Sequence, residues 1–177
     1  MTGFLRRLGR DRRGVSAVEF ALIAPAMIAC YFGMAEITQA LLAERKAAHA
    51  ASAVGDLVTQ SSSVSSDDIT DIFAIARTIM APYSTTSLKM RVSSLTADSG
   101  GTPKVDWSSA SGLTALTTGS TVSDVPTGVI SAGQSVVMSE VTYSYDSPVD
   151  VMMPNAVTFT RKFYLRPRKS DKVAKTS

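Results

Sequence analysis

The sequence predicts an α+β protein in which a long N-terminal transmembrane helix continues into a small domain with a short helix and an antiparallel sheet of three to four strands. Three patterns support this prediction. They are a long apolar stretch near the N-terminus, a short amphipathic stretch after a serine-rich linker, and alternating apolar and polar residues in the C-terminal half. With 177 residues, 45% of them hydrophobic, the chain has room for one membrane anchor and one modest domain.

The apolar stretch begins directly after a basic leader, residues 1–14, which contains five arginines and one aspartate. The uncharged core, residues 20–35, spans about 24 Å as a helix, which is shorter than the roughly 30 Å of membrane hydrocarbon. We therefore assign the transmembrane helix to residues 15–43, which places Glu36 near the far interface. Pro25 removes one helical hydrogen-bond donor and predicts a mild kink that membrane helices tolerate.

The helical pattern continues beyond the membrane segment. No proline occurs between Glu36 and Gln60, and alanine-rich sequence favours helix. We expect one helix from about Val15 to about Thr59, whose second half packs on the domain. His49, the only histidine, is expected on a solvated face. The expected packing stripe consists of Ile37, Leu41, Ala48, Ala51, Val54 and Val58.

A second, shorter helix is expected after the serine-rich linker 61–66. Ser66 and the two aspartates that follow it favour a helix start, because a hydroxyl caps the first turn and carboxylates interact with its positive end. Pro82 ends the pattern. The expected buried face consists of Ile69, Ile72, Phe73, Ala76 and Met80.

Strand patterns occupy the rest of the chain. Residues 88–93 alternate between apolar and polar, and residues 104–107 form a second short candidate. Residues 108–133 are rich in Ser, Thr and Gly and are expected to be mostly loop. Residues 134–145 and 156–165 are the two longest strand patterns, and we expect them to pair as an antiparallel hairpin.

The residues around Gly14 have the pattern of a processing site. A carboxylate such as Glu19, so near the start of a membrane-length apolar segment, is costly unless it has a partner, and a cut after Gly14 would create an α-amine on Val15. The sequence RRGVSAVEFALIAP at 12–25 resembles the TadE/TadF-type minor pilins of the Tad (Flp) type IV pilus system. A weaker resemblance to the same family covers residues 136–168.

This resemblance implies a minor pilin, or pseudopilin, that acts in pilus assembly, for example in initiating or capping the filament. It implies cleavage by a prepilin peptidase between Gly14 and Val15, and roles for Glu19 and Phe20 in subunit recognition and assembly, with Pro25 as a helix kink. The implied partners are the prepilin peptidase, other pilin subunits and the inner-membrane pilus assembly platform.

The resemblance also implies the domain organisation. The basic leader 1–14 would be cytoplasmic, because positive charge flanking a span stays inside. The transmembrane or filament-core helix would cover 15–43, and a pilin-like domain at 44–165 would be periplasmic or part of an extracellular pilus. A basic tail follows at 166–177, which by default would be solvated and frayed or would otherwise bind an acidic partner or anionic lipid.

Charge and motif content exclude several other function classes. The net charge of +3 comes from basic residues at the two ends, with no basic and aromatic platform between them, so we expect no nucleic-acid binding. We find no catalytic motif, no metal-ligand spacing and no phosphate-binding glycine loop, and so expect no enzyme activity, metal or cofactor.

Three alternatives remain open at this stage. The chain could be an uncleaved membrane-anchored binding or assembly protein, or an anchored hydrolase whose site is scattered through the loops. Cys30 follows a poor lipobox and would suit a lipoprotein signal, but the sequence after it stays apolar. N-terminal sequencing distinguishes an uncleaved anchor from a processed pilin.

Overall fold

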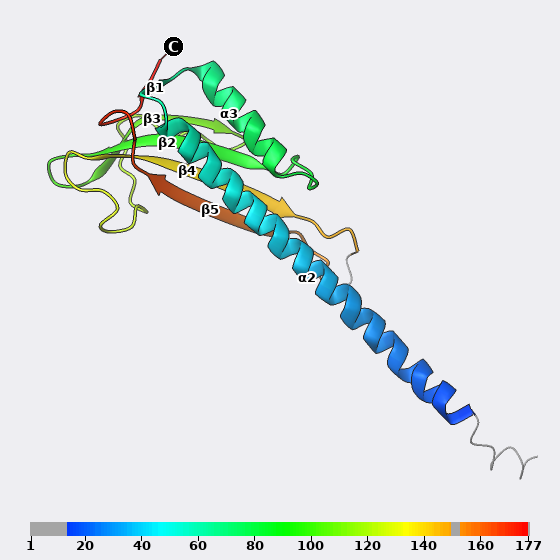
Figure 1. Cartoon of the computed structure of the whole chain (residues 1–177). Helices are drawn as coiled ribbons and strands as arrows, with labels where there is room; N and C mark the ends of the chain where they lie inside the picture. The colour runs from blue at the N-terminus through cyan, green and yellow to red at the C-terminus, as the bar shows by residue number, and fades with distance from the viewer. Residues whose placement is uncertain (1–13, 150–152, 177) are drawn as a thin grey trace, which may run out of the picture.

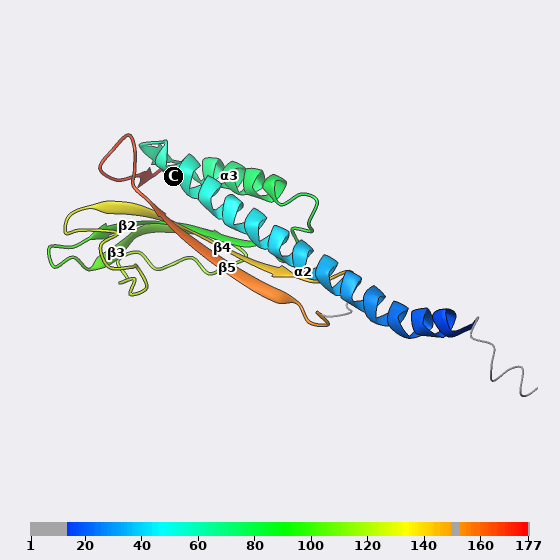
Figure 2. The same cartoon turned by 60° about the horizontal axis from the view of Figure 1, so that its bottom comes forward.

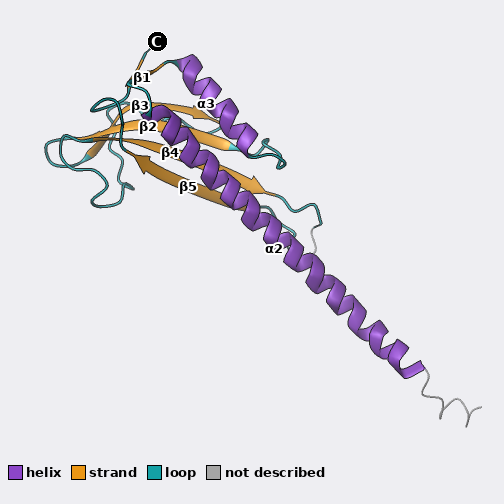
Figure 3. Ribbon diagram, in the orientation of Figure 1, coloured by secondary structure: helices purple, strands orange, loops and turns teal. Residues whose placement is uncertain are grey.

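The computed structural model describes residues 14–149 and 153–176, and its longest helix lies with its second half on an antiparallel sheet (Figure 1). The predicted α+β class is confirmed, with one long helix, one short helix and a four-stranded sheet (Figure 3). In chain order the elements are α2 (Val15–Thr59), β1 (Ser63–Val64), α3 (Ser66–Ile79), β2 (Lys89–Ala97), β3 (Pro103–Ser111), β4 (Ser135–Tyr145), β5 (Val157–Leu165) and β6 (Ala174–Lys175).

The four-stranded sheet has the order β3-β2-β4-β5, with every neighbouring pair antiparallel. The expected hairpin of the two longest strands is present, with Val137 opposite Leu165 and Tyr145 opposite Val157. Both helices cover one face of this sheet (Figure 2). The opposite face has a smaller core under the loop that follows β3, formed by Leu95, Val105, Val122, Val136 and Met138.

The face of α2 that packs on the sheet differs from the expected stripe. Ile37 and Leu41 are both 51% exposed, and Ala48 is only half-buried, whereas Ala51, Val54 and Val58 are buried as expected. Alanine side chains let the helix axis approach the sheet closely, so they form the packing face, and the larger apolar side chains point away from the domain. The buried positions of the upper half are Glu36, Ala40, Ala43, Ala47, Ala50, Ala51, Val54, Gly55, Val58 and Thr59.

Helix α3 begins one residue earlier than its sequence suggested. Ser65, not Ser66, is the N-cap: its Oγ accepts a hydrogen bond from the Asp68 backbone N–H at 3.1 Å, and Asp68 Oδ2 accepts one from the Ser65 N–H at 2.8 Å. This reciprocal pair satisfies two of the free donors of the first turn. The hydrogen bond from the Ser65 backbone also lowers the pKa of Asp68. The expected buried face of α3 is confirmed.

The basic C-terminal segment packs back onto the domain, so the expectation of a frayed tail is wrong for its described part. Strand β6 pairs in parallel with β1, and Val173 just before it is fully buried. Trp107 Nε1 donates a hydrogen bond to the Val173 carbonyl at 2.7 Å. Arg168 forms an ion pair with Asp56 of α2. Residues close to the C-terminus thus tie β3 to the top of the long helix.

Replacing Val173 with Asp tests this attachment, because a buried carboxylate without a partner is strongly disfavoured. We expect the segment to detach, leaving Trp107, the only tryptophan, in contact with water. The measurement is the fluorescence emission of the full chain in detergent, which should shift to longer wavelength. Lys172→Asp, at the exposed neighbouring position, is the control and should leave the emission unchanged. Equal spectra for both variants would contradict the described packing.

Candidate functional site

The first half of α2 leaves the domain and exposes apolar side chains on all sides. Alone among the described helices, α2 is long and apolar enough to cross a membrane, and none of its most apolar 18-residue window is buried. The first buried position along it is Gly33. The free part, residues 15–32, is about 27 Å long, close to the roughly 30 Å of membrane hydrocarbon. The domain therefore begins where a bilayer would end.

The residues singled out from the sequence all lie on this free part. Gly14 is the N-cap residue and Val15 the first residue of α2. Glu19 and Phe20 are exposed, the latter by 70%, and Glu19 makes no hydrogen bond or ion pair within the described residues. The helix is continuous through Pro25. The structure thus places these positions together at the end of the helix farthest from the domain.

Glu36 is a buried carboxylate at the junction between the free helix and the domain. Its residue is only 3% exposed. Oε1 accepts a hydrogen bond from Ser147 Oγ at 3.0 Å, and Oε2 accepts one from the Met153 backbone N–H at 3.2 Å. Such hydrogen bonds offset the cost of removing the carboxylate from water. Glu36 therefore fastens the connection between β4 and β5 to the helix.

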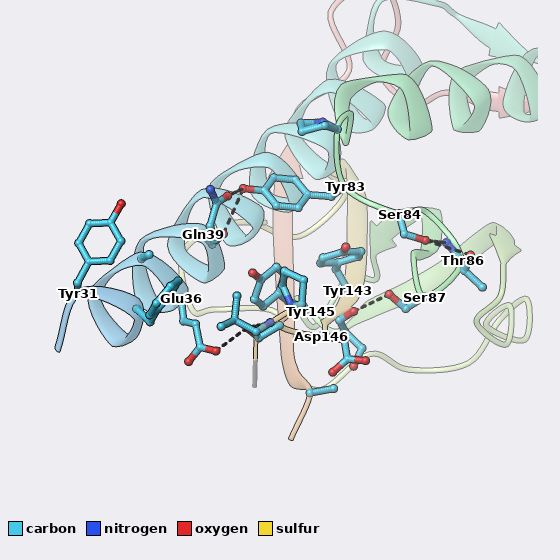
Figure 4. A pocket seen from close by; sticks show the side chains of 18 residues that line it. Tyr31, Glu36, Gln39, Tyr83, Ser84, Thr86, Ser87, Tyr143, Tyr145 and Asp146 are labelled. Atoms are coloured by element: carbon cyan, nitrogen blue, oxygen red, sulfur yellow. Dashed lines mark hydrogen bonds between the residues drawn. The ribbon is translucent and has the colours of Figure 1, made fainter. Parts of the chain in front are cut away.

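A groove of about 990 Å³ opens beside Glu36 (Figure 4). Tyr31 and Gln39 line it from α2, and Tyr83, from the loop after α3, closes one wall by donating a hydrogen bond to Gln39 Oε1 at 2.8 Å. Tyr143 and Tyr145 line it from the end of β4. The rings of Tyr83 and Tyr145 meet edge to face, with centroids 6.0 Å apart. Tyrosine side chains thus contribute to the groove from α2, from the loop after α3 and from β4.

The charge in the groove is negative. Its described lining includes the carboxylates of Glu36 and Asp146 and no Lys, Arg or His. Asp146 is exposed and forms no ion pair within the described residues. Burial raises the pKa of the Tyr83, Tyr143 and Tyr145 hydroxyls, so these side chains stay neutral. Such a surface suits an apolar group that carries a positive charge.

The contact between Glu36 and the domain was not predicted from the sequence, because the packing face of the helix was assigned to its large apolar residues. The sequence placed Glu36 near the far membrane interface but did not indicate that it lies on the helix face that packs on the domain. A signal was present in the sequence: Glu36, Ala40, Ala43 and Ala47 recur at helical spacing, which marks one face. The tyrosines of the groove are distant in sequence, and only the sheet register and the loop after α3 bring them together.

The described residues show no arrangement typical of a metal centre. Within 14–149 and 153–176, no group of three or more His, Cys, Asp or Glu side chains could hold a metal ion. His49 is exposed on α2 and Cys30 is exposed on its free half. The features that stand out are the free apolar helix and the junction groove, both of which are suited to contacts with lipid or protein.

Replacing Glu36 with Ala tests the junction. The change leaves the buried Ser147 hydroxyl and the half-buried Met153 N–H without this acceptor, and we expect it to destabilise the domain by about 1–3 kcal/mol. Glu44→Ala removes an exposed ion pair with Arg161 and serves as the control, with an expected loss below about 1 kcal/mol. Thermal unfolding of both variants in detergent measures the difference. Equal losses would contradict a structural role for Glu36.

Comparison with known proteins supports the resemblance seen in the sequence. Residues 14–56, which include nearly all of α2, match the family model of the TadE-like proteins. No curated protein and no solved structure matches the chain. The match covers the free apolar helix and its packing face as well as the positions Gly14, Glu19 and Glu36. The N-terminal helix of this chain is thus similar to the TadE-like proteins, as its sequence predicted.

Proposed function

We propose that this chain is a minor pilin of a Tad-type pilus, and that it acts in pilus assembly through structural contacts rather than catalysis. The observation that carries the proposal is the free, apolar half of α2 within the region that matches TadE-like proteins. A helix of this kind can be anchored in lipid before assembly and packed against other apolar helices afterwards. Its partners are other pilin subunits and the inner-membrane assembly platform.

The proposed topology follows from the charge of the leader. Residues 1–14 hold five arginines, which favour a cytoplasmic N-terminus, whereas Arg45 and Lys46 beyond the apolar segment are fewer. The sheet domain then lies on the periplasmic side of the inner membrane. Because its contacts with α2 begin at Gly33, the domain would rest directly against the head groups. In a filament it would form the outer layer around the apolar helices.

Glu19 supplies a physical reason for ordered packing of subunits. After cleavage behind Gly14, the new α-amine of Val15 is mostly charged at neutral pH, and so is a glutamate with an ordinary pKa. Either charge alone in an apolar bundle costs several kcal/mol, roughly, whereas a pair offsets part of that cost. The amine of an adjacent subunit is the best-placed partner, because the helix directs its own amine along the axis and Glu19 sideways. This pair of charges would fix the depth at which a subunit is inserted into the bundle of apolar helices.

Cleavage by the prepilin peptidase is the first test of this function. We expect the mature chain to start at Val15, because Gly14 has no Cβ and lets the peptidase approach the backbone closely. In the structure, a Cβ built on Gly14 meets nothing within 4 Å, so Gly14→Leu should leave the fold unchanged while blocking cleavage. Edman sequencing of membrane-extracted protein gives the start directly. A mature chain that still starts at Met1 or Thr2, in cells with the peptidase, would refute processing.

Glu19→Gln tests the charge pair, because it keeps size and hydrogen bonding and removes only the charge. We expect normal insertion and cleavage, but loss of co-purification with other pilins and impaired pilus assembly. Sheared pili and membranes are compared by immunoblot at matched protein levels. The control is Asp71→Asn, which removes a carboxylate charge at an exposed position on α3 and should leave piliation normal. Normal piliation by the Glu19→Gln variant would show that the charge does not position the subunit.

A further inference from the structure

An apolar stripe lies on the outer side of α2, next to the domain yet not covered by it. Met34, Ile37 and Leu41 are 66%, 51% and 51% exposed. They recur at spacings of three and four residues and therefore share one face. Arg45 follows one turn later on that face; it is exposed and forms no ion pair within the described residues. The stripe thus combines large apolar side chains with one unpaired positive charge.

The stripe and the junction groove lie on different sides of α2. On the stripe side, Glu44 forms an ion pair with Arg161 of β5. On the groove side, Lys46 Nζ donates to the Ile79 carbonyl at the end of α3, and Gln39 accepts from Tyr83. At 100° per residue, the centre of Met34, Ile37 and Leu41 is about 130° from Ala35 and about 170° from Gln39, whereas Tyr31 lies within about 90° of it. One chain therefore cannot bring its own stripe into its own groove.

We propose that the groove binds the stripe of a second copy of this chain. The apolar side chain of Leu41 from the second copy would lie against Ala35 and the tyrosines, and Arg45 would reach Asp146. The charges support this occupant, because the groove offers an unpaired carboxylate and no described cation, while the stripe offers an unpaired arginine. This inference rests on the proposed function and adds the contact through which subunits join.

The register of the contact follows from helix geometry. Arg45 lies ten residues beyond Ala35, and helical side chains lean toward the helix N-terminus, which brings the guanidinium of Arg45 closer to the level of Leu41. A shift of about six residues between the two helices, on the order of 9 Å, then places Leu41 beside Ala35 and the guanidinium near Asp146. The copies are thus displaced along the helix axis as well as sideways.

Such a contact joins two different surfaces and is therefore heterologous. A heterologous contact that includes a displacement along an axis cannot close into a ring and generates an open helical array instead. A phospholipid is the competing occupant at this depth. Its phosphate would require cationic or N–H donors, and the described side chains of the groove include no cation. The chemistry of the groove thus favours the protein stripe.

Cysteine cross-linking of the full chain in membranes tests the contact. Cys30→Ala removes the only native cysteine, and Ala35→Cys and Leu41→Cys place one thiol in the groove and one on the stripe. Within one chain these positions are about 10 Å apart along and around the helix, too far for a disulfide. After mild oxidation we expect a ladder of cross-linked multimers from the double variant. Two differently tagged single variants, mixed, should give only a dimer that contains both tags.

The single variants also separate the alternatives. A dimer formed by either single variant alone would indicate a symmetric contact and overturn the proposal. Absence of any cross-link would indicate lipid or another occupant and would overturn it as well. Either result would overturn only this contact, and not the proposed function, if the mature chain starts at Val15 and is found in sheared pili.

Charge reversal provides a second, independent test at two exposed positions. Arg45→Glu and Asp146→Lys should each abolish the ladder in the double-cysteine background, because like charges then meet. The two reversals in one chain should restore it. Asp71→Lys, on the exposed side of α3, is the matched control and should leave the ladder intact. A ladder that either single reversal leaves unchanged would rule out the proposed ion pair.

Discussion

The close packing of α2 on the sheet is the constraint on which the rest of the structure depends. The helix presents alanines to β4 and β5, and farther along it Gly55 lies where even a Cβ would come within 2.5 Å of Leu165 Cδ1. Small residues thus bring the helix backbone close to the sheet. Since anchor and core are one continuous helix, the orientation of the domain relative to the membrane is set by the helix itself.

Three acidic residues, spaced along α2, each form a polar contact with a different later segment of the chain. Glu36 binds the connection between β4 and β5, Glu44 pairs with Arg161 of β5, and Asp56 pairs with Arg168 of the C-terminal segment. The exposed pairs contribute little to the free energy of unfolding, since solvent screens them. Their effect is on alignment, because each fixes one part of the chain along the helix. Two of the seven basic residues from 161 to 177, Arg161 and Arg168, thus form ion pairs with the long helix.

The sequence predicted the elements well because their periodicities are strong. The extent of α2, the buried face of α3 and the hairpin of β4 and β5 are as predicted, whereas β3 (Pro103–Ser111) is longer than the short strand 104–107 that the sequence suggested. The groove could not be predicted, because Tyr83 and Tyr145 meet only through the register of the sheet and the path of a loop. The packing face was misassigned because a stripe of Ile and Leu is the usual sign of burial. In α2 the alanines mark the buried face, because small side chains let the helix backbone approach the sheet closely, and Ile37 and Leu41 stay outside.

The two glutamates of the apolar region show how folding and assembly are divided along one helix. Glu36 finds its hydrogen-bond donors within the chain, so its burial is settled when the domain folds. Glu19 has no partner among the described residues, and the apolar helix around it offers none. A lone carboxylate in hydrocarbon is unfavourable, so any arrangement that supplies a positive group at that depth is stabilised relative to the isolated chain. The domain is thus complete as a single copy, whereas the free helix is stabilised further by a neighbour. Under the proposed function this imbalance would favour association, and the proposed contact of groove and stripe would then determine which sides of two copies meet.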